Sequence, residues 1–392
     1  MNVKYLTIII SSMLSFASHS QNDLRFNELV AYIKKAESPM VLQQEDARVL
    51  VSSNQAQVIT SSTAVNGYCY GWLDEATLKK NKTEKTKLFY GGEDRFWLNP
   101  LGSRFSLYYG QKKIQQENWK VPDLFVKAIF PKVEQSKTKV TFKKENVEVV
   151  NNIGTTFNID IERQITLYTK KEINKILQIT IPEEIKSVGF GSETIVINRG
   201  VSWEEKKGLI TPWAIGMFKG ATTAVGIFPF NGNATSLDLS TYFFDTEKDR
   251  VRIKDSVVYF KTDGEKRSKI GLPREHSKPV IGYYDYENHR LTIIKYSLDK
   301  KGKYLSSDEE YLEDPYHGDV VNSYNNASDA NGSTFFELET TAPAKALKTN
   351  ESVSHLHQIF HFEGKELFLN EISKTILGCE LMGLNNVLNS GK

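Results

Sequence analysis

The feature that most constrains the fold is a run in which apolar and polar residues alternate. Phe157, Ile159, Ile161, Ile165 and Leu167 occupy alternate positions, and polar side chains separate most of them. Successive side chains of a β-strand point to opposite faces of its sheet, so this spacing predicts a strand with one buried face. Such strands must bury their apolar faces against another layer of structure.

Further short strands are expected along most of the chain. Their expected ranges are 175–181, 193–198, 255–261, 290–296 and 334–340. Asn-Gly and Asp-Gly pairs, which favour tight turns, separate many of them. Aromatic residues make up 11% of the sequence, which also favours strands. We find no internal repeat and no linker, so the sequence predicts an all-β fold of large antiparallel sheets packed face to face.

The first residues have the pattern of a secretory signal peptide. An apolar and hydroxyl-rich stretch from Tyr5 to Phe16 is too short to span a bilayer, and small residues follow at Ser18 and Ser20. We therefore expect a signal peptide over residues 1–20 and a periplasmic or secreted protein. No later segment has the length and hydropathy of a membrane span.

The mature chain is expected to begin with one short helix. Phe26, Leu29, Val30 and Ile33 have helical spacing, so residues 21–44 are assigned to this helix and its lead-in. Residues 45–392 are assigned to a single β domain.

Charge and cysteine content exclude several classes of protein. Lys and Arg number 50 and Asp and Glu number 48, so nothing in the net charge of +2 points to nucleic acid as a partner. Cys69 and Cys379 are the two cysteines, and their spacing excludes a Cys-x-x-Cys metal or redox site. They form either a disulfide bond or two buried thiols, and the sequence leaves this open.

The densest group of chemically active residues follows a glycine pair at 91–92. Glu93, Asp94, Arg95 and Trp97 lie within five positions. Carboxylates and a guanidinium hydrogen-bond sugar hydroxyls, and an indole covers the C–H face of a sugar ring. The block therefore predicts a sugar-binding site, with an internal ion pair beside a turn as the alternative.

Two further blocks carry candidate binding residues. An Asp263-Gly264 hairpin signal lies between Lys261 and Lys269, which would project from the flanking strands. Glu337 and Glu339 would share one face of a strand, where their mutual repulsion would raise at least one pKa and suit acid–base chemistry. In both cases the alternative is a solvated surface.

Three of the seven histidines lie close together near the C-terminus. His355, His357 and His361 fall within seven positions and have the same strand parity. A His-x-His pair on a strand can hold a divalent metal, and the loop His317-Gly318-Asp319 could add ligands. Structural histidines with hydrogen-bonded rings are the alternative, and no cofactor is otherwise expected.

Two polar stretches are expected to form loops over a working face. Residues 111–137 carry scattered aromatic side chains, and residues 299–333 are rich in Asp, Glu, Asn and Tyr. Long loops in a compact β protein often build a binding site.

The C-terminal blocks resemble the galactose-mutarotase-like superfamily, which includes the aldose 1-epimerases. The resemblance rests on Leu338-Glu339-Thr340, then Pro343, a turn at 350–352 and an aromatic strand at 359–362. It implies a β-supersandwich, a catalytic role for Glu339 and a sugar-binding role for Arg95. Over residues 45–380 the chain is closer still to an uncharacterised family of secreted bacterial proteins with GGEDRFW and FKxDGxxRSKIG blocks.

One departure from the superfamily pattern concerns the catalytic acid. Mutarotases pair the glutamate with a histidine, but no histidine occurs between His19 and His276. Trp213 stands near the expected position, and an indole cannot transfer a proton. The resemblance therefore transfers Glu339 and Arg95 as sugar-facing candidates but not the acid, and it leaves open whether the chain is an enzyme. Trp213 is added to the candidate sugar-binding residues.

Taken together, these residues predict an exported protein that binds or processes carbohydrate. One alternative is a sugar epimerase, lyase or hydrolase that uses Glu339 with a displaced acid such as His317 or His357. Another is a non-catalytic scaffold in a glycan-handling system. The sequence names neither the sugar nor the oligomeric state.

Overall fold

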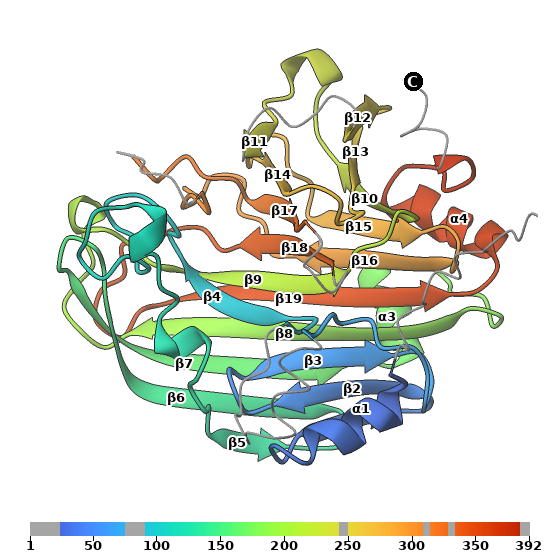
Figure 1. Cartoon of the computed structure of the whole chain (residues 1–392), viewed down its shortest axis with the longest axis horizontal. Helices are drawn as coiled ribbons and strands as arrows, with labels where there is room; N and C mark the ends of the chain where they lie inside the picture. Colours follow the sequence, from blue (N-terminus) through green and yellow to red (C-terminus); the bar gives the residue numbers. More distant parts are fainter. Residues whose placement is uncertain (1–23, 75–90, 243–249, 309–313, 328–333, 385–392) are drawn as a thin grey trace, which may run out of the picture.

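The computed structural model describes residues 24–74, 91–242, 250–308, 314–327 and 334–384. Within these ranges the strands form three antiparallel sheets, of ten, six and three strands. Figure 1 shows the two larger sheets stacked in the body of the molecule, with β1–β3 in front of the β6–β8 region. The first 20 residues lie outside the described residues, and so does the signal peptide expected there.

The ten-stranded sheet is the largest layer. Its strands, in spatial order, are β12 (Val251–Lys254), β13 (Val257–Lys261), β10 (Ala224–Pro229), β15 (Val280–Asp285), β16 (Arg290–Tyr296), β19 (Ser352–Glu363), β8 (Lys186–Asn198), β7 (Thr156–Leu167), β6 (Lys139–Val150) and β5 (Lys132–Gln135). The alternating run from Phe157 to Leu167 forms β7, so its prediction as a strand is confirmed.

The six-stranded sheet carries most of the predicted site residues. Its order is β11 (Ser240–Tyr242), β14 (Ser268–Leu272), β17 (Val321–Asn325), β18 (Phe335–Thr341), β9 (Thr211–Lys219) and β4 (Arg95–Asn99). The expectation of an uninterrupted loop over 299–333 is wrong, because β17 lies inside that range and pairs with both β14 and β18. Likewise β5 lies inside the loop expected at 111–137, which otherwise holds short 3₁₀ turns at Gln116–Asn118 and Asp123–Phe125.

The smallest sheet and the first helix form one corner of the molecule. The sheet consists of β1 (Met40–Gln44), β2 (Ala47–Ser52) and β3 (Gln57–Ser62). Helix α1 (Phe26–Ile33) packs on it through Phe26, Leu29 and Ile33, as the helical spacing predicts. Arg25 is the N-cap residue of this helix, and its backbone N–H donates to the Glu28 carboxylate at 2.8 Å.

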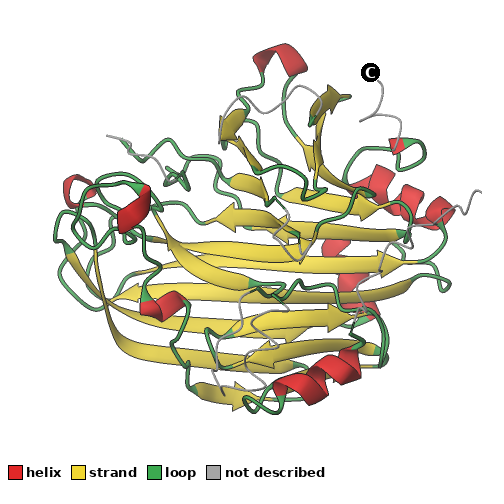
Figure 2. Cartoon of the chain, viewed as in Figure 1, coloured by secondary structure: helices red, strands yellow, loops and turns green. Residues whose placement is uncertain are grey.

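Two further helices were not expected from the sequence. Helix α3 (Lys170–Leu177) occupies part of the strand predicted at 175–181, so that prediction is wrong. The hydroxyl of Thr169 and the carboxylate of Glu172 cap its first turn reciprocally, a local signal that overrides the short apolar run. Helix α4 (Glu366–Ile376) follows β19, and both helices pack in one hydrophobic cluster with Phe360 and Phe362 of β19. Figure 2 shows α3 partly hidden behind the strands and α4 at the edge of the sheets.

The hydrophobic core lies between the ten-stranded and six-stranded sheets. Phe336 and Leu338 on β18 point into it, and so does Phe218 on β9. The Phe336 ring packs edge-on against Tyr283 of β15, with ring centroids 5.0 Å apart. These positions alternate with those of the opposite face of the six-stranded sheet, here called its polar face. That face carries the charged side chains of Arg95, Glu337 and Glu339 beside the buried indoles of Trp97 and Trp213. The predicted all-β supersandwich is confirmed in this arrangement.

Two smaller expectations concern membrane spans and cysteines. Among the described residues, no helix is long and apolar enough to cross a membrane. Cys69 and Cys379 are both described, and they are buried in different hydrophobic clusters and form no disulfide bond.

Candidate functional site

One row of paired residues crosses the polar face of the six-stranded sheet. In this row Arg95 of β4 pairs with Ile215, which pairs with Glu339 of β18. Glu339 in turn pairs with Asn322 of β17, and Asn322 pairs with Gly271 of β14. Directly paired residues of antiparallel strands point to the same side, so these side chains share one face.

Glu339 is the most enclosed carboxyl group of this face, with 1% of its surface exposed. Its Oε2 accepts hydrogen bonds from Lys269 Nζ at 3.2 Å and from Trp213 Nε1 at 3.1 Å. Burial raises the pKa of the Glu339 carboxyl, and the charge and hydrogen bond of Lys269 oppose the rise. A buried carboxylate of raised pKa, held by two donors, is suited to accept a proton.

Lys269 connects the carboxylate of Glu339 to the backbone at Ser307. Its Nζ also donates to the carbonyl oxygen of Ser307 at 3.0 Å. The ammonium lies 5.6 Å from the ring centroid of Trp213 and 5.5 Å from that of Tyr242. The lysine is 4% exposed and is therefore held in a single position beside Glu339.

Arg95 and Glu337 form a second ion pair on the same face. Arg95 Nη2 lies 3.1 Å from Glu337 Oε1, and the two side chains are 5% and 15% exposed. The Arg95 guanidinium also lies 5.6 Å from the ring centroid of Trp97, whose indole packs edge-on against Trp213. The structure thus brings together six predicted residues from four strands: Arg95, Trp97, Trp213, Lys269, Glu337 and Glu339.

The most accessible part of this face lies around Tyr324. This half-buried residue of β17 pairs with both Lys269 and Glu337. Its hydroxyl accepts a hydrogen bond from the exposed Arg267 at 3.1 Å. Exposure therefore decreases from Arg267 and Tyr324 towards Glu339.

Three predicted binding residues lie apart from this group. Glu93 is fully buried and bonds Ser61 and the Nε2 of His361, the latter at 2.7 Å. Asp94 is also fully buried and lies 2.9 Å from Arg163 Nη2 in an ion pair. Lys261 is half-buried on β13 of the ten-stranded sheet. For Asp94 the structure shows the internal ion pair that the sequence left as the alternative.

The three C-terminal histidines are buried between the sheets. The hydroxyl of Thr340 lies 2.7 Å from His355 Nε2 and 2.8 Å from His357 Nδ1, so it donates to one ring and accepts from the other. His361 bonds Thr292 at 2.7 Å and stacks on Tyr70 with ring centroids 3.8 Å apart. Within the described ranges, no three His, Cys, Asp or Glu side chains are placed to hold a metal ion.

The burial of His357 predicts a pH-dependent stability. Burial lowers its pKa from 6.5 to about 4, so the unfolded chain takes up a proton first as pH falls. Its contribution to stability is complete above pH 6.5 and is lost between pH 6.5 and 4. We expect the unfolding free energy of the wild type to fall by about 3 kcal/mol relative to that of His357→Asn between pH 7 and 4.

Chemical denaturation of both proteins at several pH values measures this difference. His317→Asn, at a side chain that is 85% exposed, controls for the loss of a histidine as such. A constant difference between wild type and His357→Asn across this pH range would contradict the prediction.

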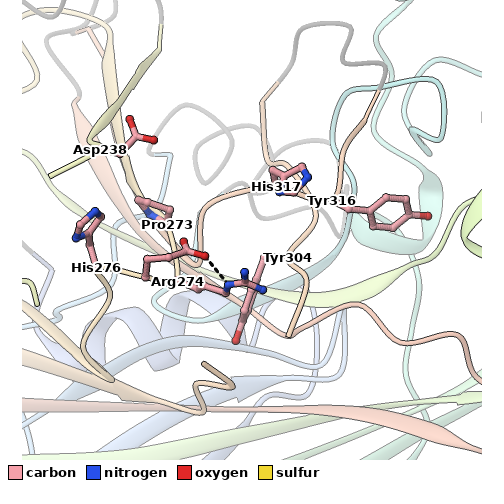
Figure 3. A pocket seen from close by; sticks show the side chains of 9 residues that line it. Asp238, Pro273, Arg274, His276, Tyr304, Tyr316 and His317 are labelled. Carbon is pink, nitrogen blue, oxygen red and sulfur yellow. Dashed lines mark hydrogen bonds and ion pairs between the residues drawn. The ribbon is translucent and has the colours of Figure 1, made fainter. Parts of the chain in front are cut away.

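A cavity of about 270 Å³ lies beyond the end of β14. Its lining residues are Asp238, Pro273, Arg274, Glu275, His276, Tyr304, Tyr316, His317 and Gly318. Figure 3 shows the labelled side chains around this space. Arg274 Nε donates a hydrogen bond to the carboxylate of Glu275 at 2.6 Å. His317 therefore lines this cavity, whereas His355, His357 and His361 lie between the sheets.

Four residues near Glu339 were not predicted as part of a sugar site, and of these the sequence marked only Asp319, as a possible metal ligand. They are Tyr242, Asp319, Asn322 and Tyr324, and three of them come from the range interpreted as a loop. The alternation of Val321, Ser323 and Asn325 with Asn322 and Tyr324 is a strand pattern, but its polar composition concealed it.

The sequence places the chain in a family. The chain belongs to DUF6786, a family of unknown function whose model matches residues 24–388. No curated protein matches the sequence.

Several solved structures are similar to this chain at about a tenth of sequence identity. The Slr1438 protein from Synechocystis sp. PCC 6803 is 10% identical, with 84% of this chain and 96% of that chain covered and a TM-score of 0.52. A putative aldose 1-epimerase from Escherichia coli K12 is 10% identical over 83% and 98% of the two chains, with a TM-score of 0.49. A galactose mutarotase related enzyme from Lactobacillus acidophilus is 10% identical over 84% and 100%, with a TM-score of 0.47. The likeness to the Slr1438 protein shows a shared fold and nothing further.

Proposed function

We propose that this protein is an exported carbohydrate-binding protein and that the sugar binds on the polar face of the six-stranded sheet. The observation that carries the proposal is the convergence of Arg95, Lys269, Glu337 and Glu339 on that face, beside Trp97. Two carboxylates and two cations provide both acceptors and donors for hydroxyl groups. Their charges cancel, so the face suits a neutral sugar.

The gradient of exposure supports entry of the sugar at Tyr324. This ring is the half-buried aromatic side chain beside Glu337, and it provides an apolar surface for the C–H face of a sugar. Glu339 is 1% exposed, so a ligand reaches it only when neighbouring groups move aside. Lys269 bonds both the Ser307 carbonyl and Glu339. A movement of the backbone at Ser307 would therefore also change the contacts of the Glu339 carboxylate.

Thermal unfolding in the presence of sugars tests the proposal. A ligand that binds only the folded state raises the unfolding midpoint by mass action. The panel contains neutral mono- and oligosaccharides, each measured with and without EDTA. We expect one class of sugar to raise the midpoint.

The variant Glu337→Gln tests the location of the site. It is isosteric and removes the negative charge that pairs with Arg95, and we expect it to weaken sugar binding by about 10- to 100-fold. Glu205→Gln, in the exposed pair with Lys303, is the matched control and should bind as the wild type does. If no sugar raises the midpoint, the scaffold alternative is favoured, and if Glu337→Gln binds normally, the site is misplaced.

A further inference from the structure

The loops at one end of the sandwich are rich in basic residues. Strands β4, β6, β8, β16 and β18 finish at this end, and β7, β9 and β19 begin there. It is the end away from α4 in Figure 1. Its segments, together called the basic end, are 100–120, 151–155, 199–208, 297–304 and 342–351. They hold 12 Lys and Arg and five Asp and Glu, a net charge of +7, whereas the whole chain carries +2.

The turn at 151–155 joins two of these segments. Asn152 Nδ2 donates to the backbone carbonyl of Lys112 at 2.9 Å. Asn151 Nδ2 donates to the backbone carbonyl of Lys207 at 2.8 Å. The turn therefore lies between Lys112 on one side and Lys207 on the other.

The segment that contains Lys207 also contacts the remaining two. Lys303 Nζ lies 2.7 Å from Glu205 Oε2. The backbone N–H of Trp203 donates to the carbonyl of Leu347 at 2.9 Å. These contacts make the five segments of the basic end one continuous surface.

Most of the cations on this surface have no counter-ion. Within the described residues, seven exposed lysines of the basic end make no ion pair: Lys112, Lys113, Lys120, Lys300, Lys301, Lys345 and Lys348. Like charges gathered in one place repel one another, and a partner of opposite charge relieves that repulsion. An extended anionic surface is therefore the partner that this charge distribution favours.

Two exposed apolar side chains lie among these cations. Ile153, at the tip of the turn beside Lys112, is 50% exposed, and Val201 is 80% exposed. Among the described large apolar side chains, none is more exposed than Val201. Apolar side chains beside lysines are stabilised where lipid headgroups meet acyl chains, an environment that a soluble polyanion does not provide. The apolar pair therefore favours a lipid surface as the partner.

We propose that the basic end docks this protein on a bilayer surface rich in anionic phospholipid. The lysine ammonium groups pair with lipid phosphates, and Ile153 and Val201 insert between the headgroups. Docking requires neither the sugar nor its site. It also leaves the proposed sugar entrance free, because the pairing of β17 with β18 places Val321 towards the basic end and Tyr324 away from it.

Sedimentation with vesicles tests the docking. The full chain is mixed with vesicles of phosphatidylcholine alone, or of phosphatidylcholine and phosphatidylglycerol in equal parts. The apolar residues 5–16 are present in every sample, so the measured quantity is the difference in binding between the two kinds of vesicle. We expect the wild type to prefer the anionic vesicles, and the preference to weaken as salt is added, because salt screens exposed charges.

Removal of lysines locates the contact. Each lysine near an anionic bilayer strengthens binding by about five-fold, so Lys112→Gln/Lys113→Gln/Lys348→Gln should weaken binding to the anionic vesicles by about 100-fold. The matched control removes three exposed lysines of α3 and the start of β8, at the other end of the sandwich: Lys171→Gln/Lys175→Gln/Lys186→Gln. It should bind within a few-fold of the wild type. All six positions are exposed, so both variants should unfold at the wild-type midpoint.

Removal of the apolar side chains separates a bilayer from a soluble polyanion. We expect Ile153→Ser/Val201→Ser to weaken binding to the anionic vesicles by about 10-fold. The same variant should bind heparin, a soluble polyanion, as the wild type does.

Three results would overturn the proposal: no preference of the wild type for anionic vesicles at low salt, an equal loss in both lysine variants, or full vesicle binding by the serine variant. Binding to heparin without binding to vesicles would also overturn it and would assign the basic end to a soluble polyanion. None of these results bears on the sugar site, which the thermal unfolding experiment tests separately.

Discussion

Asp94→Asn is expected to lower the free energy of unfolding by about 3–5 kcal/mol, because it leaves the guanidinium of Arg163 buried without a counter-ion. Both side chains are fully buried, and Arg163 Nη2 lies 2.9 Å from Asp94 Oδ1. Arg163 belongs to β7 of the ten-stranded sheet, and Asp94 immediately precedes β4 of the six-stranded sheet. The pair therefore joins the two layers of the sandwich across their core.

The remaining contacts of Arg163 cannot replace the lost charge. Its Nε donates to the carbonyl of Ala56 at 2.8 Å and its Nη1 to Thr194 Oγ1 at 2.6 Å, and both acceptors are neutral. They hold the guanidinium in place, so it cannot move towards solvent when its counter-ion is removed.

Denaturant unfolding of Asp94→Asn and of Asp123→Asn tests this expectation. Asp123 pairs with Lys127 where both side chains are more than half exposed, so its loss should cost less than about 1 kcal/mol. The double variant Asp94→Asn/Arg163→Met removes both charges and should recover part of the lost stability. A loss below about 1 kcal/mol for Asp94→Asn would show that the buried charge is compensated in another way.

The layered β architecture could be predicted from the sequence because period-2 alternation is a local property. The alternating residues of β7 and β16 carry that signal within each strand. Two elements could not be found in this way. One is helix α3, where the capping residues favour a helix although the short apolar run suggested a strand. The other is β17, a strand of polar composition that is stabilised by pairing with β14 and β18 in the folded protein.

The candidate site was predictable in part, for a related reason. Parity along one strand placed Glu337 and Glu339 on the same face, and that statement needs no knowledge of neighbouring strands. Glu93 and Asp94 directly precede β4, and the bend there turns both into the interior, where they pair with His361 and Arg163. Sequence proximity to Arg95 therefore did not imply a shared environment.

The contact between Lys269 and Glu339 could not be predicted from the sequence. The two residues are 70 positions apart, and their strands are separated by β17. The register of three strands decides that they meet, and no local pattern reports register. The same holds for Asp319, which reaches this face because Gly271 leaves room for it.

Lys269→Met is expected to give the second large effect, a loss of about 3–5 kcal/mol at neutral pH, because the buried Glu339 must then either stay charged without its cation or take up a proton. The side chains of the pair are 5% and 1% exposed, and Nζ lies 3.2 Å from Oε2. Methionine retains much of the volume of the lysine stem, so the lost charge dominates the change. In the wild type Lys269 opposes the rise in the pKa of Glu339 that burial causes, and without it that pKa rises further.

The pH dependence of this loss identifies its cause. A carboxyl group whose folded-state pKa lies above its unfolded-state value contributes stability below the unfolded-state pKa and loses it as the pH rises through the folded-state pKa. We therefore expect the deficit of Lys269→Met, measured by denaturant unfolding, to be smaller at pH 5 than at pH 8. The double variant Lys269→Met/Glu339→Gln carries no buried charge at this position and should show no such difference.

A deficit that is the same at both pH values would mean that lost packing, and not the uncompensated carboxylate, destabilises the variant. A deficit that grows with pH would show that the carboxylate of Glu339 needs the charge of Lys269 to remain ionised inside the fold.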